Sequence, residues 1–271
     1  MNLTELYRQI FCEPSLIEAA AHASIRQVFR ARLMAADPQA AQRTAMFCGE
    51  AVDLESMEIK NGIAYIPIGG AIGQKLGDYS KIRGAVDVAD IETDIAEAEA
   101  DPRVRAMVFD MDSPGGMVSG TPELADRIAG RTKPIYTFSN GMIASAAYWI
   151  ASATDGIFTT KTANIGSIGV YVPHYDETQA YANEGVTVEL IKSGKLKGIG
   201  FPGIPLSDAG REHLQERVNE IGAMFKAHVR SRRQGVADST MEGQTFMAPA
   251  ALKLGLINAI VRSRADVAAM L

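Results

Sequence analysis

The sequence is poor in cysteine and has no long apolar run. Only Cys12 and Cys48 occur among its 271 residues, and neither stands in a CxxC pair. Two such cysteines do not form a disulfide framework, so a reducing compartment is the simplest expectation. No stretch approaches the roughly 18–20 apolar residues of a membrane helix, and the N-terminus lacks the features of a secretory signal. We therefore expect a soluble, cytoplasmic protein without a membrane anchor.

A strong excess of charge of one sign is also lacking. The net charge is −5, with 22% charged and 47% apolar residues. No basic face dominates, which argues against a general affinity for nucleic acid or anionic membranes. The basic cluster at Arg230, Arg232 and Arg233 is interpreted as a solvated helix end. A chain of this length and composition can bury a sizeable core without disulfides.

Strands and helices alternate along most of the chain. A helix is predicted over residues 14–35, followed by a connector over 36–55. Beyond the connector, strands are predicted at 62–68, 105–111, 134–138, 155–160, 168–172 and 187–192, and helices at 86–99, from 121, 143–152, 207–233 and from 249. This alternation predicts an α/β fold with a largely parallel sheet. Ligands bind to such sheets where strands end and helices begin.

Ser145 follows a predicted strand at the beginning of a helix that is rich in small residues. The N-terminus of a helix presents unpaired N–H groups, and its dipole favours developing negative charge. The N–H of Ala146, the residue after the serine, is placed to help bind an oxyanion. The alternative interpretation is a tightly packed helix without a chemical role. This segment alone does not separate the two.

A second glycine-rich strand end, Ser113-Pro-Gly-Gly, favours a chemical role. Gly115 and Gly116 leave backbone N–H groups bare and free to adopt unusual dihedral angles. Such groups suit a second oxyanion donor, although a plain turn explains this motif equally well by itself. The two glycine-flanked strand ends together are a better signal than either alone.

A serine nucleophile also requires a general base. Three of the four histidines, at positions 22, 213 and 228, fall in predicted helices outside the central region and are interpreted as ordinary helix residues. His174 follows a strand and is a candidate base.

The other candidate base lies in the lysine-rich segment with Lys192, Lys195 and Lys197. A lysine acts as a base when desolvation or a neighbouring positive charge lowers its pKa, and three lysines supply both the base and the charge. A basic surface loop is the alternative interpretation. From the residues alone, the histidine and the lysines all stay open.

Five motifs, in order along residues 58–262, resemble the S49 peptidases. They are DSPGG, MIASAAYWIAS, TANIGSIGVY, IKSGKLKGIG and GQTFMAPAALKLGLINAI. The family includes signal peptide peptidase A and the capsid assembly proteases of lambda-like phages. Each motif is modest alone, but five in order are highly specific. The resemblance implies a ClpP/crotonase-like fold, a Ser–Lys dyad, and no cofactor or metal.

The resemblance also implies roles for individual residues. Ser145 matches the nucleophile, and the pattern Ser-Gly-x-x-Lys at 193–197 selects Lys197 as the base. Ser167 resembles the residue that orients the lysine amine. Gly115 and Gly116 resemble the oxyanion loop, with Ala146 as the donor after the nucleophile.

Within the family, the N-terminal segment and the motif DMDSPGGMVSG look most like phage capsid proteases. Those enzymes act inside a precursor capsid on scaffold, portal or capsid proteins, which implies the host cytoplasm or the procapsid as the location. We expect an N-terminal helical extension and connector over 1–55, a peptidase domain over 56–262 and a tail over 263–271. Because the chain stops just after the peptidase domain, the scaffold is expected either as a separate product or beyond this fragment. A homo-oligomer is expected, since some members take Ser and Lys from different subunits.

Four alternatives remain at this stage. One is a signal-peptide-peptidase-like enzyme that degrades peptides in the cytoplasm, and another is a ClpP-like peptidase with His174 as base. A third is a crotonase-type acyl-CoA enzyme, which needs no serine nucleophile. The fourth is an assembly protein that kept the fold and lost the activity.

Overall fold

The computed structural model describes residues 15–17, 56–76 and 84–271. The predicted connector over 36–55 lies outside these residues, as does most of the predicted helix over 14–35. Within that helix prediction, Ser15–Ile17 forms a strand, β1, so the prediction is wrong for these three residues. The strand exists because it pairs with a distant segment of the chain, a partner that local sequence periodicity does not reveal.

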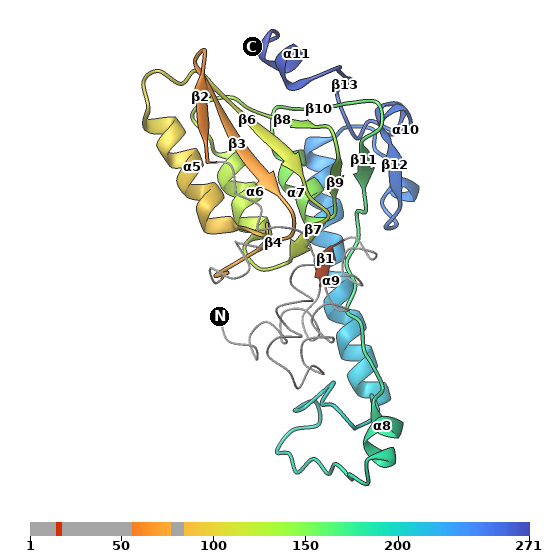
Figure 1. The fold of residues 1–271 in the computed structure, drawn as a ribbon. Coiled ribbons are helices and arrows are strands. Elements are labelled where there is room, and N and C mark those ends of the chain that lie inside the picture. The colour runs from red at the N-terminus through yellow and green to blue at the C-terminus, as the bar shows by residue number, and fades with distance from the viewer. Residues whose placement is uncertain (1–14, 18–55, 77–83) are drawn as a thin grey trace.

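A six-stranded sheet forms the centre of the molecule (Figure 1). Its order is β13-β10-β8-β6-β3-β2, and every neighbouring pair is parallel except β2 with β3. The strands are β2 (Glu58–Lys60), β3 (Ile63–Gly69), β6 (Ala106–Asp112), β8 (Ile135–Ser139), β10 (Gly156–Thr159) and β13 (Ala259–Ile260). The predicted α/β fold with a largely parallel sheet is confirmed.

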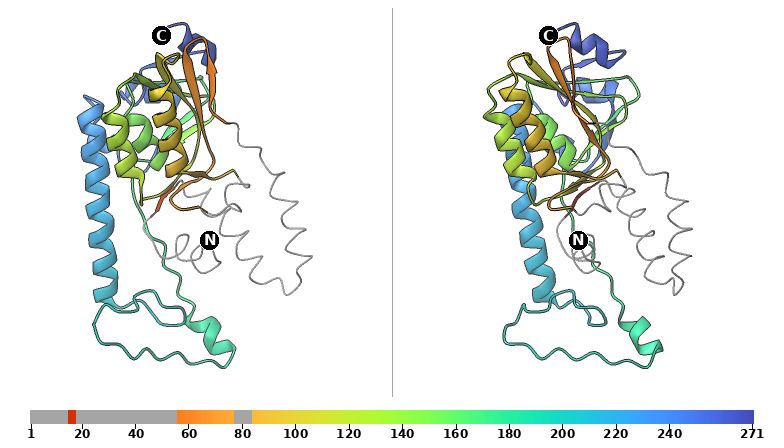
Figure 2. Two further views of the ribbon diagram at one scale, coloured as in Figure 1. Left: turned by 90° about the vertical axis from the view of Figure 1, so that its left-hand side faces the viewer. Right: turned by 60° about the vertical axis from the view of Figure 1, so that its left-hand side comes forward.

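Helices cover one face of this sheet in a layer that contains α5, α6 and α7 (Figure 2). Their bounds are Val88–Ala100 for α5, Thr121–Ala129 for α6 and Ala146–Ser152 for α7. Inward-facing residues such as Ile66, Met107 and Phe109 form the main core with these helices. Helix α6 begins at Thr121 as predicted; its N-cap is Gly120, and the Thr121 hydroxyl donates to the Met117 carbonyl at 2.8 Å.

The opposite face of the sheet carries a smaller apolar cluster that includes Tyr65, Val108 and Val267. Val267 belongs to α11 (Arg264–Ala268). The Arg264 guanidinium holds this helix against the sheet. It donates to Asp110 at 2.7 Å and lies 4.4 Å from the centre of the Tyr65 ring. Near this end of the chain are also the 3₁₀ helix η1 (Asp238–Thr240) and α10 (Ala248–Lys253).

Two smaller sheets add short strands beside the central one. The first has the order β1-β7-β4-β5 and the second β12-β11-β9. Their strands are β4 (Ile72–Gly73), β5 (Val86–Asp87), β7 (Gly115–Met117), β9 (Met142–Ala144), β11 (Asn164–Gly166) and β12 (Thr245–Met247).

These short strands correct three predictions. Residues 143–144 belong to β9 rather than to a helix, the strand predicted at 168–172 lies at 164–166, and no strand forms at 187–192. Pairing decides the first two outcomes, since β9 lies parallel to β11 with Ile143 opposite Ile165. Small apolar residues suit either a helix or a strand, so tertiary context makes the choice.

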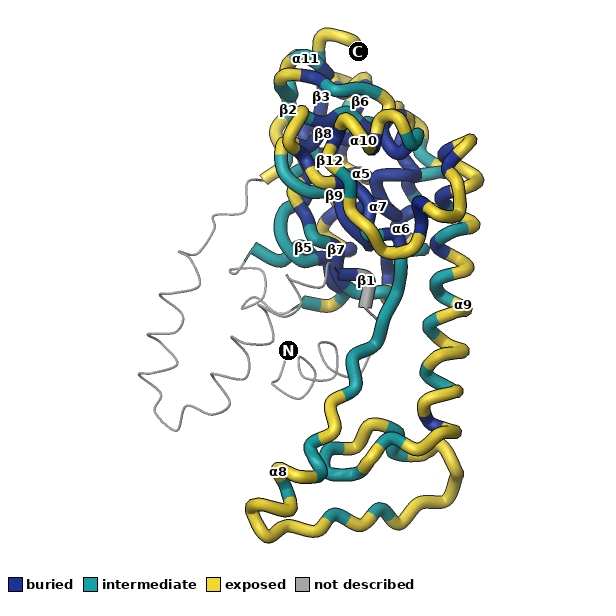
Figure 3. The backbone as a smooth tube through the Cα atoms, turned by 90° about the vertical axis from the view of Figure 1, so that its right-hand side faces the viewer, coloured by how far each residue is buried: buried dark blue, intermediate teal, exposed yellow. Residues whose placement is uncertain are grey.

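An arm extends away from the body between β11 and α9 (Figures 1 and 3). It contains α8 (Thr178–Asn183) and the irregular segment 184–207, and the chain returns through α9 (Asp208–Arg232). A helix of 25 residues is about 37 Å long. Only Gly210, Phe225 and Val229 of α9 are buried, so its C-terminal half anchors it to the body. No helix among the residues described is long and apolar enough to cross a membrane.

Candidate active site

Ser145 connects β9 to α7 in a rarely adopted backbone conformation. Its φ is 56° and its ψ is −119°, and its residue surface is 1% exposed. Its N–H donates to the Gly166 carbonyl at 2.8 Å, and its own carbonyl accepts from the Trp149 N–H at 3.0 Å. A residue other than glycine held at such angles costs about 1–3 kcal/mol. A strained serine between a strand and a helix is the arrangement that presents a nucleophile in α/β hydrolases.

Helix α7 holds this turn from the inside of the protein. All seven of its residues are buried. Tyr148 donates its hydroxyl to the Leu256 carbonyl at 2.9 Å, and burial raises the pKa of this phenol. Trp149 stacks on Phe225 of α9 with ring centres 4.6 Å apart. The helix start at Ala146 is therefore fixed by packing, which suits a preorganised N–H donor.

The Ser113-Pro-Gly-Gly segment lies directly beside the strand that leads into Ser145. Ser113 bridges Ile143 in parallel, its N–H donates to Met142 at 2.9 Å, and its carbonyl accepts from Ala144 at 3.1 Å. The Ser113-Pro-Gly-Gly motif and Ser145, which follow two separate strand ends, are thus brought together.

Ser113 also organises the glycine loop, a role that the sequence analysis missed. Its buried hydroxyl donates to the Gly70 carbonyl at 2.6 Å and accepts from the Gly115 N–H at 3.1 Å. The Gly115 N–H is thereby engaged inside the loop. In the sequence, the position of Ser113 at the end of a strand and shortly before two glycines was the signal that could have indicated this role.

Gly116 occupies a place that no larger residue fits. A Cβ atom there would lie 1.8 Å from the Ile72 carbonyl oxygen of the neighbouring strand β4. Gly115 has a φ of 95°, in the region that favours glycine. Both glycines are therefore required by the backbone itself, whichever N–H group meets a ligand.

Ser167 lies close to Ser145 through strand pairing. It follows Gly166, which pairs with Ala144 in the parallel β9–β11 ladder. Its φ is 52°, and its N–H donates to the Gln244 carbonyl at 2.6 Å. Ser145 and Ser167 therefore lie just beyond the same end of two adjacent strands.

The candidate bases lie elsewhere, on the arm. Lys197 is exposed and belongs to segment 184–207, at the end of α9 that is remote from β9 and α7 (Figures 1 and 3). His174 is half-buried against the same arm, with its Nδ1 atom 4.0 Å from the Cβ position of Gly200. Within one chain, the structure brings neither Lys197 nor His174 to Ser145.

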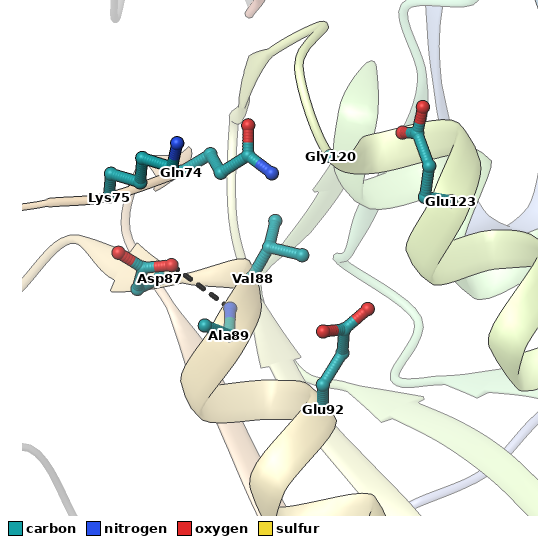
Figure 4. A pocket seen from close by; sticks show the side chains of 8 residues that line it. All are labelled: Gln74, Lys75, Asp87, Val88, Ala89, Glu92, Gly120 and Glu123. Atoms are coloured by element: carbon teal, nitrogen blue, oxygen red, sulfur yellow. Dashed lines mark hydrogen bonds between the residues drawn. The ribbon is translucent and has the colours of Figure 1, made fainter.

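A separate small cavity of about 180 Å³ lies among β4, α5 and α6 (Figure 4). It is lined by Gln74, Lys75, Asp87, Val88, Ala89, Glu92, Gly120 and Glu123, and by none of the predicted site residues. The Asp87 carboxylate accepts from the N–H groups of Leu76 and Ala89, at 2.6 and 2.9 Å, so it has a structural role. In the part of the chain that the structure describes, no group of three or more His, Cys, Asp or Glu residues is arranged to hold a metal ion.

Comparison with solved structures gives low scores. A ClpP1 variant from Listeria monocytogenes aligns with a TM-score of 0.49 and 14% identity, covering 75% of this chain and 94% of that chain.

Curated proteins show a clearer similarity. Capsid assembly protease C of Escherichia phage lambda is 34% identical over 214 residues, covering 77% of this chain and 48% of the phage protein. Head-tail preconnector protein GP5 of Enterobacteria phage P21 is 28% identical over 288 residues, covering 99% of this chain and 57% of that protein. The chain spans about half the length of the curated relatives it matches.

The family assignment comes from a sequence profile. The profile of peptidase family S49 matches residues 128–270, which is more than half of the chain. The matched region contains Ser145, Ser167 and Lys197, while the glycine loop at 115–116 precedes it. The chain therefore belongs to peptidase family S49.

Proposed function

We propose that this chain is a serine endopeptidase that cleaves scaffold, portal or capsid proteins during assembly of a phage or prophage capsid. The observation that carries the proposal is the strained Ser145, held between β9 and α7 beside the Ser113–Gly116 loop. The similarity to a lambda capsid assembly protease supports the choice of substrate class.

In the proposed reaction, the Ser145 hydroxyl attacks the substrate carbonyl and gives its proton to neutral Lys197. The oxygen that becomes negative is held by the N–H groups of Gly116 and Ala146, because the Gly115 N–H is engaged by Ser113. Lys197 then protonates the leaving amine, which leaves an acyl-enzyme on Ser145. Finally, Lys197 takes a proton from water, which hydrolyses the ester.

We further infer that Lys197 acts on the Ser145 of a neighbouring copy. The arm carries Lys197 away from its own nucleophile, while large apolar side chains stand exposed beside it, with Ile191 94%, Leu196 40% and Phe201 49% exposed. Apolar groups gathered in this way mark a contact surface. Covering them with a second copy removes water from the lysine amine, and desolvation disfavours the charged form of an amine. Ser167, at the end of β11, is the proposed acceptor that orients the amine.

Mixing two inactive variants tests this arrangement. Ser145→Ala and Lys197→Ala are each expected to lose turnover of a small ester substrate. In a ring assembled from equal amounts of both, about a quarter of the sites pair an intact serine with an intact lysine, so about a quarter of the wild-type rate should return. The double variant mixed with wild type is the control. A mixture that stays inactive contradicts a dyad shared between copies.

The same assay separates the lysine base from His174. Lys197→Ala with full turnover would exclude the proposed dyad, and loss of turnover in His174→Ala alone would favour the histidine. Since both residues lie on the arm, a lower rate counts only where circular dichroism and oligomeric state match the wild type.

Substrate class requires a separate experiment. The chain is co-expressed with scaffold and capsid proteins of its own phage or prophage, and intact masses are compared between wild type and Ser145→Ala. Truncated products are expected only with wild type. Identical masses in both samples would remove the claim of capsid processing.

A further inference from the structure

The short N-terminal strand β1 lies beside β7, the strand that contains Gly115 and the proposed oxyanion donor Gly116. It pairs antiparallel with β7, with Ser15 opposite Met117, Leu16 opposite Gly116, and Ile17 opposite Gly115. Ile17 is buried, with 7% of its surface exposed. About a hundred residues separate these segments in the sequence, so the pairing is a tertiary feature.

Strand β1 fills the free edge of β7. On its other side β7 pairs with β4, through Ile72 opposite Gly116. The order β1-β7-β4-β5 therefore leaves β7 with two occupied neighbours. An extended peptide commonly binds a protein by adding a strand to a sheet edge, where main-chain hydrogen bonds supply affinity. The edge that such a peptide needs here is already taken.

The direction of β1 matches that of a bound substrate. The strand runs from the Met117 end of β7 toward the Gly115 end. The Gly115 end leads back to Ser113, which is hydrogen-bonded to β9 just before Ser145. The chain thus approaches the nucleophile with its carboxyl end, as residues on the acyl side of a scissile bond must do.

The surroundings of the nucleophile are closed in this arrangement. Ser145 is 1% exposed, and Gly115 and Gly116 are also buried. An attacking hydroxyl and its oxyanion donors need contact with a substrate carbonyl, so a closed site is not the working state.

We propose that the segment containing Ser15–Ile17 is a built-in competitor for substrate, which holds the edge of β7 until a peptide displaces it. The inference rests on the proposed role of Ser145 as a peptidase nucleophile. A strand of three residues forms few main-chain hydrogen bonds. A substrate peptide offers the same main-chain groups to the three residues of β7 and adds contacts beyond them, which allows it to replace β1.

A binding experiment tests the competitor without any catalysis. The Ser145→Ala chain is compared with the same chain carrying Ile17→Asp, using as probe a fluorescent peptide with the sequence of residues 13–19, EPSLIEA. A charge at a buried position disfavours the β1 pairing. We expect the peptide to bind about tenfold more tightly to the Ile17→Asp chain. Equal affinities overturn the proposal.

Two further variants serve as controls for this binding experiment. Met270→Asp places the same charge where the native side chain is 60% exposed, and it should leave the affinity unchanged. Leu16→Pro removes a backbone N–H from β1 without burying a charge, and it replaces Ile17→Asp where circular dichroism shows a loss of fold.

Turnover measurements with Ser145 intact separate the two proposals. Ile17→Asp should lower KM for a peptide substrate about tenfold at unchanged kcat. Tighter peptide binding without any Ser145-dependent hydrolysis would refute the peptidase and retain the competitor at the β7 edge. Hydrolysis with unchanged binding and KM would refute the competitor and retain the peptidase.

Discussion

The N–H of Ser145 donates to the carbonyl oxygen of Gly166 at 2.8 Å, which ties this serine to the strand that ends just before Ser167. Ser145 and Ser167 both have a left-handed φ, 56° and 52°. Each therefore leaves its strand through a sharp, strained turn, and the β9–β11 pairing sets the spacing between them. Because the pairing of β9 with β11 positions both serines, a change that weakens this pairing should alter both the stability of the protein and the geometry of the candidate site.

The strain at Ser145 predicts an unusual order of variant stabilities. The free energy of unfolding of Ser145→Gly should be about 1 kcal/mol higher than that of Ser145→Ala, because only glycine accepts a positive φ without a Cβ penalty. Both variants should lack hydrolysis. Urea denaturation measures the difference. At Ser152, the last residue of α7, ordinary helical preference should reverse the order and favour alanine over glycine by about 1 kcal/mol.

Gly116→Ala should be strongly destabilising. The new Cβ would overlap the Ile72 carbonyl oxygen, 1.8 Å away, so β4 and β7 must move apart. Overpacking of this kind costs about 3 kcal/mol, and it displaces the proposed oxyanion donor. Gly222→Ala in α9 is the matched control, since nothing lies within 4 Å of its Cβ position. That variant should gain about 0.5–1 kcal/mol. Similar stabilities of the two variants would contradict the close contact.

Phe225 anchors the arm-bearing helix to the active-site helix. Its ring is fully buried and lies 4.6 Å from Trp149, at an interplanar angle of 9°. Phe225→Ala should lower the free energy of unfolding by about 3–5 kcal/mol. It should also lower turnover, because α9 positions the arm. Met224→Ala, at a neighbouring position that is 50% exposed, should change neither quantity appreciably.

The burial of His228 should make the stability of the protein depend on pH. Burial lowers its pKa to about 4, with a further contribution from Arg232 and an opposing one from Asp126. An unfolded histidine titrates near its ordinary value of 6.5. The unfolded state therefore binds the proton first as pH falls. The stability that comes from the neutral, buried His228 should be fully present above about pH 6.5. As the pH falls toward 4, the free energy of unfolding should decrease by about 1 kcal/mol, after allowance for partial exposure of the ring.

Urea denaturation at pH 7 and pH 4.5 measures this effect. His228→Gln should remove the part of the pH dependence that belongs to this residue. His213→Gln, near the other end of the same helix, should retain it. An unchanged dependence in His228→Gln would show that other groups cause the loss of stability in acid.

The sequence alone predicted four of the six strands of the central sheet, β3, β6, β8 and β10, and it indicated Ser145 as the candidate nucleophile. Strands such as β3 and β6 are almost completely buried, so they appear as continuous apolar runs that stop at glycine or aspartate. Ser145 was recognisable because a strand, a small-residue helix and a nearby glycine motif coincide. The base was identifiable only through family resemblance, and its role stays a prediction.

The tertiary structure alone decided what surrounds Ser145. Strands β1, β9 and β11 have three residues each, too few to leave a periodic signal, and they form because distant partners supply their hydrogen bonds. The position of Lys197 is likewise a tertiary result. Burial of Phe225 and Val229 fixes only the C-terminal half of α9 to the body, so the other half projects and carries the arm away from Ser145.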